Sequence, residues 1–251
     1  MMRINRFLAL AGIASRRKAD DLVRAGRVQV NGRVLAEVGV TVNPESDRIT
    51  VDGRLVELPQ QTQVVLFNKP AGYLVSRRAQ GGKPTIYAVL PPNVQALHPI
   101  GRLDFDTDGV LLLTDDGELS RRLQHPRYEI ERVYHAVVSR PPHRLRIEAA
   151  RAGVDLGDKT PARAEIRILC EREHDCVLEV RLREGRKHEV KRLLGRAEAP
   201  VTKLTRVSFA ALGVGRLAPG ACRQLNDREI ATLRRQVGLA ESQSGTFGNG
   251  I

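Results

Sequence analysis

The sequence is poor in aromatic residues and in cysteine. It has no tryptophan, and aromatic residues make up 4% of its 251 positions. Base stacking can therefore supply only a small part of any affinity for nucleic acid. The three cysteines, Cys170, Cys176 and Cys222, are odd in number and form no C-x-x-C pair. This pattern argues against a disulfide framework and a zinc site, and it favours a reducing compartment.

The sequence also lacks any apolar run long enough for a transmembrane helix. Its first apolar segment is interrupted by charges and has no cleavage-type signal, so we expect a cytoplasmic protein that does not bind membrane. Positive charge, by contrast, is in excess. The net charge of +12 favours a polyanionic partner, and nucleic acid is a better candidate than a membrane surface.

A nine-residue loop, residues 101–109, is the first candidate for chemistry. It contains Asp104, Asp106 and Asp108 and runs into the apolar segment Val110–Leu113, which predicts a buried strand. Carboxylates beside apolar surface are costly unless they are paired. Three alternatives remain open from spacing alone: a calcium-binding loop with the wrong flanking residues, an aspartyl phosphatase motif without its preceding strand, and a plain polar turn.

Residues 1–57 predict a small basic module. Two helices are expected, the second capped by Ser15, and Asn31-Gly32 between short apolar runs predicts a β-hairpin. Residues 58–63 have no periodicity and predict a linker. Residues 64–240 predict a larger α+β domain with a mostly antiparallel sheet, including a helix over 186–194. The last residues, 241–251, predict a disordered tail.

The loop Gly101-Arg102-Leu103-Asp104, followed by Thr107, Gly109 and an apolar strand, resembles the active-site motif of pseudouridine synthases. The segments Asn68–Gly72 and Arg186–Leu194 resemble two further motifs of that family. Residues 12–20 and 30–32 resemble the S4 RNA-binding domain that precedes the catalytic domain in one branch, which modifies ribosomal RNA.

This resemblance implies that a uridine within RNA is isomerised, with no cofactor and no metal. Asp104 matches the essential aspartate, which acts either as a nucleophile or as a base; the sequence leaves both open. Tyr134 matches a tyrosine that lies against the uracil. Lys191 matches a basic residue that pairs with the aspartate, and Arg102 matches an arginine that fills the place of the flipped nucleotide.

In the S4-like module the resemblance implies RNA contacts from a basic surface: Arg16, Arg17, Lys18, Arg24, Arg27 and Arg33. Such cations meet mainly phosphates, which position the module rather than read sequence. The resemblance favours 23S ribosomal RNA, alone or in a ribosome assembly intermediate, as the partner of a monomeric enzyme. A 16S target and a non-catalytic RNA-binding protein are the alternatives.

Overall fold

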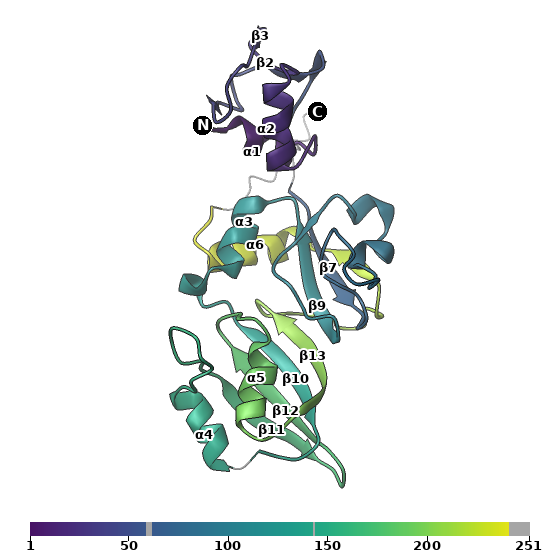
Figure 1. Ribbon diagram of the computed structural model, residues 1–251, viewed down its shortest axis with the longest axis vertical. Coiled ribbons are helices and arrows are strands. Elements are labelled where there is room, and N and C mark those ends of the chain that lie inside the picture. Colours follow the sequence, from purple (N-terminus) through teal and green to yellow (C-terminus); the bar gives the residue numbers. More distant parts are fainter. Residues whose placement is uncertain (59–61, 143, 241–251) are drawn as a thin grey trace, which may run out of the picture. The chain divides into compact units, whose positions relative to one another are not determined.

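The computed structural model describes residues 1–58, 62–142 and 144–240. Its contacts divide the chain into two compact units, one built mainly from residues 1–62 and the other from residues 63–114 and the chain after residue 117. Half of the expected linker 58–63, namely residues 59–61, and the whole expected tail, 241–251, lie outside the described residues. Figure 1 shows the labelled elements.

The N-terminal unit consists of two helices and two small sheets. Helix α1 (Ile4–Leu10) is followed by α2 (Arg16–Arg24), and the side chain of Ser15 caps α2 by accepting a hydrogen bond from the Lys18 N–H at 3.4 Å. Strands β1 (Met2–Arg3) and β4 (Thr41–Val42) form one antiparallel pair. The other sheet has the order β3-β2-β5-β6, with bounds Arg33–Val34, Val28–Val30, Ile49–Val51 and Arg54–Leu55. The predicted helix cap and hairpin are confirmed.

The larger unit is built on a nine-stranded mixed sheet. Its main path runs β11-β12-β10-β13-β9-β7-β15, with β14 paired to β13 and β8 to β9. The strands are, in chain order, β7 (Val64–Lys69), β8 (His98–Pro99), β9 (Thr107–Thr114), β10 (Arg132–Val138), β11 (Glu165–Glu171), β12 (Cys176–Leu182), β13 (Val201–Phe209), β14 (Leu212–Gly213) and β15 (Cys222–Gln224). Only the β9–β13 pairing is parallel within these described strands, so the predicted α+β class is confirmed.

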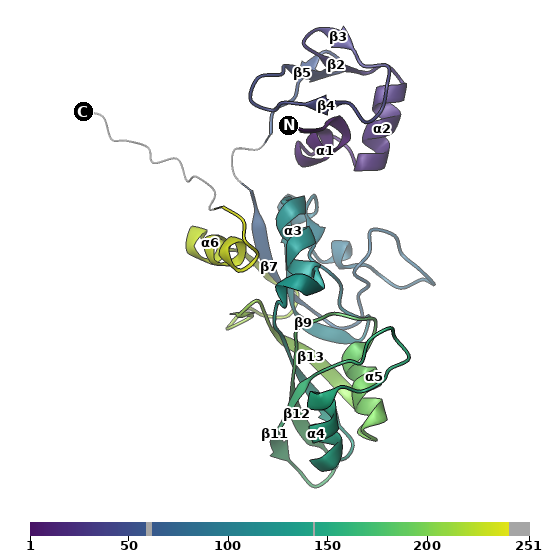
Figure 2. The ribbon, with the colours of Figure 1, turned by 90° about the vertical axis from the view of Figure 1, so that its left-hand side faces the viewer.

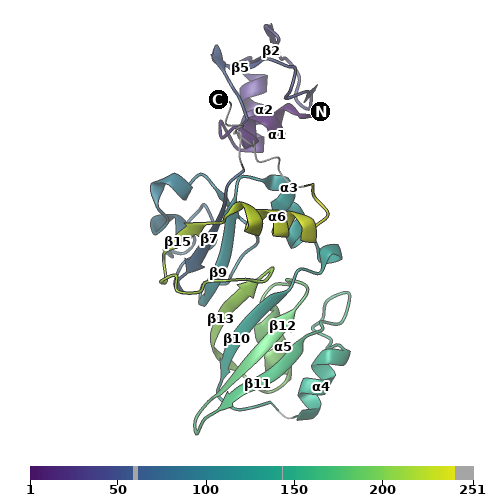
Figure 3. The same ribbon diagram turned by 180° about the vertical axis from the view of Figure 1, so that it is seen from behind.

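Helices cover different parts of this sheet. Figures 1 and 3 show α5 (Glu189–Arg196) on one face of β10, β12 and β11, with α4 (Arg144–Ala152) beside it. Figure 2 shows α3 (Gly117–Gln124) and α6 (Asp227–Gln236) near β7 and β9. The other face of β7 and β9 packs on the short turns η1 (Ile86–Ala88) and η2 (Pro92–Val94). A further turn, η3 (Pro126–Tyr128), leads toward β10.

The parallel contact between β9 and β13 joins the two halves of the sheet, and it depends on Gly109. This residue has a φ of +104°, and a Cβ on it would lie 2.2 Å from the Arg206 carbonyl oxygen. Only glycine allows so close an approach of the two backbones. The pairing places Thr107 opposite Leu204, directly after the aspartate-rich loop. The sheet therefore holds that loop from its C-terminal end.

The helix expected over 186–194 begins three residues later, at Glu189. His188, which precedes it, has a left-handed backbone with φ 51° and ψ 33°. Periodicity predicted the helix but not this entry turn, because the conformation is imposed by contacts with distant segments. As a result His188 leaves the helix and joins the loop residues described next.

Candidate active site

A buried lysine supports the loop that carries Asp104. Lys69, at the end of β7, has no exposed surface. Its Nζ donates to the carbonyl oxygens of Pro70 at 3.0 Å, Asp104 at 3.2 Å and Thr107 at 2.8 Å, and more weakly to that of Phe105 at 3.5 Å. Three of these carbonyls belong to the loop and the first residue of β9. One ammonium group thus ties β7 to the turn from which Asp104 projects.

Burial also changes the acid–base behaviour of this lysine. Burial lowers the pKa of Lys69 to about 8, while the nearby carboxylates Asp108, Asp106 and Asp104 oppose that change. A charged amine that leaves water needs compensating dipoles or charges. The carbonyls and the three aspartates supply them, so the acidic residues of the loop and Lys69 stabilise each other.

Asp104 lies at the mouth of a cavity and faces His188. Its Oδ1 is 3.4 Å from His188 Nε2, and its side chain is 32% exposed. The carboxylate is therefore neither sealed in the core nor free in bulk water. The left-handed backbone of His188 brings its imidazole to this position, which is a strained conformation for a residue other than glycine.

The family resemblance implied a pair between Lys191 and Asp104, but in the structure Lys191 bonds to a different aspartate. Its Nζ lies 2.5 Å from Oδ1 of Asp106, two residues further along the loop. This hydrogen bond is the main reason why the pKa of Asp106 is lowered. Spacing in sequence cannot distinguish two carboxylates on one turn, because their side chains differ only in direction. The structure still places Lys191 at the same cavity as Asp104.

Two adjoining hollows meet at Asp104. The larger, about 920 Å³, is open and is lined by both acids, Asp104 and Asp106, together with a set of basic residues: Lys83, Arg102, Arg186, Lys187 and Lys191. The smaller, about 50 Å³, is lined by Arg102, Asp104, Thr107 and Tyr134. Tyr134 sits in the middle of β10, opposite Arg206 of β13 and Val180 of β12. The four catalytic-domain residues predicted from the sequence therefore surround one site.

The turn before α5 is fixed by a buried glutamate. Glu189 is 4% exposed, and its Oε2 accepts a hydrogen bond from the Arg186 N–H at 2.9 Å. Burial, reinforced by the neighbouring carboxylate of Glu184, raises the pKa of Glu189 to about 7. The Arg186 side chain bonds to Glu184, Asp158 and the Thr160 hydroxyl. This network anchors the segment that carries His188 and Lys191.

The basic residues of the N-terminal unit differ in their environment. All six predicted RNA contacts are exposed, but Arg27 holds Asp52 through two hydrogen bonds of 2.8 and 2.5 Å, and Arg24 pairs with Asp21 at 2.9 Å. Within the described part of the chain, the one hydrogen bond of the Arg16 side chain is a long one of 3.5 Å to Asn5. Among the described residues, the start of α2, with Arg17 and Lys18 beside Arg16, and Arg33 on β3 are thus the parts of this surface that no acid engages.

Two residues of the site were not singled out from the sequence. Lys69 was noted only as part of a motif, and His188 only as part of a helix. The signal for Lys69 was a charged residue at the end of an otherwise apolar strand, which needs partners if it is buried. No local pattern pointed to His188, because its role depends on the turn that the Arg186 network holds.

No group of three or more His, Cys, Asp or Glu side chains within residues 1–58, 62–142 and 144–240 is arranged to hold a metal ion. In the same part of the chain, no helix is both long enough and apolar enough to cross a bilayer.

Comparison with known proteins identifies the family of the larger unit. The sequence model of RNA pseudouridylate synthases matches residues 63–195, and that of the S4 domain matches residues 2–49. The chain belongs to the RNA pseudouridine synthase family. It is 42% identical over 239 residues to an "Uncharacterized RNA pseudouridine synthase" of Aquifex aeolicus, covering 95% of this chain and 96% of that protein.

Other relatives agree over nearly the whole length. The chain is 36% identical to "Ribosomal large subunit pseudouridine synthase B" of Bacillus subtilis, covering 93% of this chain and 96% of the relative. A solved "Crystal structure of pseudouridylate synthase" superimposes with a TM-score of 0.65 at 30% identity, covering 93% of this chain and all of the other. This RNA pseudouridine synthase is thus an isomerase with an S4 domain at its N-terminal end, as the motifs predicted.

Proposed function

We propose that this pseudouridine synthase modifies a uridine of 23S ribosomal RNA and that Asp104 is its essential catalytic residue. The proposed target rests on the similarity to the relative named for the large ribosomal subunit. The proposed residue rests on one observation above all: Asp104 lies where the two hollows meet, with Tyr134, Arg102 and Lys191 around it.

The chemistry requires a carboxylate and a base-binding surface. The N1–C1′ bond of the uridine breaks, the uracil turns, C5 bonds to C1′, and the proton on C5 is lost while N1 gains one. No electrons are exchanged and nothing leaves. Asp104 starts the reaction at the sugar, and Tyr134 lies against the uracil and assists the proton transfer at C5.

A paired or stacked uridine must first leave its helix, which costs a few kcal/mol. Arg102 is exposed on the rim of both hollows and is placed to occupy the space that the nucleotide vacates. Lys83, Lys187 and Lys191 surround the larger hollow with positive charge. These cations are suited to the phosphates beside the flipped nucleotide.

We propose a monomeric enzyme that works in the cytoplasm. The cytoplasmic location agrees with its three free cysteines.

The decisive experiment replaces Asp104 by Asn in the full-length protein. We expect the variant to bind unmodified 23S ribosomal RNA like the wild type, but to form pseudouridine at least roughly a thousandfold more slowly. Mapping pseudouridines in RNA from cells with and without the protein identifies the modified position. Pseudouridine formation by the Asn variant at the wild-type rate would show that Asp104 is not the catalytic residue. A pseudouridine of 16S RNA that is lost in cells without the protein would show that the proposed 23S target is wrong.

A further inference from the structure

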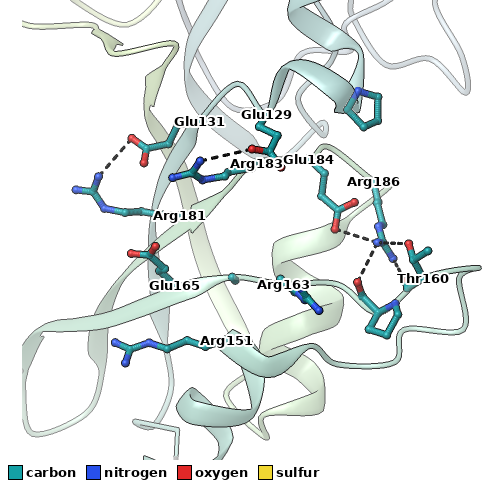
Figure 4. Close-up of a pocket in the computed structure, with 13 residues that line it drawn as sticks. Glu129, Glu131, Arg151, Thr160, Arg163, Glu165, Arg181, Arg183, Glu184 and Arg186 are labelled. Carbon is teal, nitrogen blue, oxygen red and sulfur yellow. Dashed lines mark hydrogen bonds and ion pairs between the residues drawn. The ribbon is translucent and has the colours of Figure 1, made fainter.

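A second cavity lies beside the proposed active site and has no part in the reaction described above. It measures about 930 Å³ and is lined by five arginines, four glutamates and no lysine. Figure 4 shows these side chains around the cavity, carried by the segment before β10, by α4, by β11 and the residues just before it, and by the end of β12 with the residues that follow it. A cavity of this size accepts a polar chain segment as readily as a small molecule.

The two cavities share a wall. Arg186 lines both this cavity and the two hollows at Asp104. The segment from Arg183 to Arg186 therefore runs between them, and any polymer bound at Asp104 has only this short segment to cross to reach the second cavity.

Two of the five arginines are committed to the fold. Arg186 is held by Glu184 at 2.9 Å and Asp158 at 3.3 Å. Arg181 is held by Glu179 at 2.8 Å and by Glu131 at 3.3 Å. These contacts, drawn in part as dashed lines in Figure 4, neutralise Glu131 and Glu184 on the cavity wall.

The other three arginines are available. Arg151 and Arg163 are exposed and make no hydrogen bond or ion pair with the residues that the structure describes. Arg183 has a single long contact, 3.7 Å to Glu129, between side chains that are 66% and 69% exposed. An exposed pair of this kind contributes little to stability and can be exchanged for another anion.

We propose that this cavity binds the phosphate backbone of the substrate RNA next to the target nucleotide, through Arg151, Arg163 and Arg183. The inference rests on the proposed function, because it takes the RNA bound at Asp104 as the same molecule. Guanidinium groups bind phosphate through two parallel hydrogen bonds, and the available cations here are all arginines. Once a nucleotide occupies the neighbouring hollow, the flanking strand is present at high effective concentration.

The test compares a double variant, Arg151→Gln with Arg163→Gln, with the wild type. An unmodified 23S ribosomal RNA transcript is the probe, and both Kd and pseudouridine formation are measured over a range of salt concentrations. We expect the Kd and KM to rise roughly tenfold with kcat unchanged. The plot of log K against log salt concentration should become less steep by about 1.5, because two phosphate contacts are lost. Arg183→Gln should weaken binding in the same direction.

The matched control removes two other exposed arginines of the larger unit, Arg172→Gln with Arg228→Gln, which lie outside every residue set that lines these cavities. It loses the same charge and should bind like the wild type. If RNA binding is weakened equally in both double variants, the effect comes from net charge and not from the cavity, and the proposal is overturned.

Unchanged RNA binding by the Arg151/Arg163 double variant would also overturn the proposal. An acidic protein segment would then be the alternative ligand of the cavity. Neither result bears on Asp104. A failure of the proposed function appears instead as normal turnover by the Asp104→Asn protein, so the two can be told apart.

Discussion

At the scale of single residues, the site is defined by what each basic side chain contacts. Lys69 bonds to carbonyls of the loop, His188 faces Asp104, and Lys191 bonds to Asp106. The family resemblance implied a Lys191–Asp104 pair instead. We infer that the pair of Lys191 with Asp106 is not required for catalysis, because Asp106 is 67% exposed and the pair is correspondingly easy to break.

This interpretation predicts unequal effects of removing the two partners. Lys191→Met should lower kcat by roughly a hundredfold, because a cation that stabilises charge in the transition state is lost. Asp106→Asn should change kcat by less than about threefold, because the pair it breaks is not needed during the reaction. Single-turnover rates on 23S ribosomal RNA measure both, and equal losses would mean that the Asp106 pair itself is the catalytic arrangement.

At the scale of elements, the start of α5 decides where His188 and Lys191 lie. Glu189 occupies the first turn of this helix and is almost fully buried beside Glu184 and Arg186. The hydrogen bond to the Arg186 N–H stabilises its ionised form, but burial outweighs it. A sequence pattern shows Glu189 as a favourable acid at a helix N-terminus, and only the packing shows that it is buried.

The pKa of Glu189 predicts a pH-dependent stability. Its folded-state pKa, about 7, lies above the ordinary value of 4.5. The folded state therefore holds the proton more tightly than the unfolded state, and this stabilisation is full below pH 4.5 and lost as the pH rises through 7. The loss is about 3 kcal/mol. Replacing Glu189 by Gln should raise the Tm by several degrees at pH 8 and much less at pH 5.

Thermal unfolding followed by circular dichroism at the two pH values measures this difference. The control is Glu173→Gln, which alters an exposed glutamate of the hairpin between β11 and β12. It should shift the Tm equally little at both pH values. A Glu189→Gln protein with the same small shift at both would show that the buried carboxyl is not protonated in the folded state.

At the scale of the whole molecule, affinity for RNA depends on charge rather than on aromatic surface. The chain carries 41 Lys and Arg against 29 Asp and Glu, with no tryptophan. Some of its basic residues lie at the start of α2 in one unit, and others line the cavities of the other unit. Two binding units on one RNA increase the overall affinity beyond that of either alone.

Neutralising the start of α2 should therefore weaken RNA binding without affecting chemistry. We expect a triple variant with Gln at Arg16, Arg17 and Lys18 to have a several-fold higher KM and an unchanged kcat. Its plot of log K against log salt concentration should be less steep by about 2. Binding titrations and turnover at several salt concentrations provide the measurement. A lower kcat at saturating RNA would contradict a purely positioning role for these residues.

The sequence by itself determined the α+β class, the S4-like helices and hairpin, the family, and the set of residues that meet at the site. Those features follow from local periodicity, turn chemistry and motifs, which depend on residues that are close together in the sequence. Tertiary structure alone decided that Lys69 is buried under the loop, that His188 leaves the helix to face Asp104, and that Lys191 bonds to Asp106. It also decided that Arg151 and Arg163 line a second cavity without an ion pair among the described residues. Each of these depends on the direction of a side chain from a distant segment, which packing sets and sequence spacing does not.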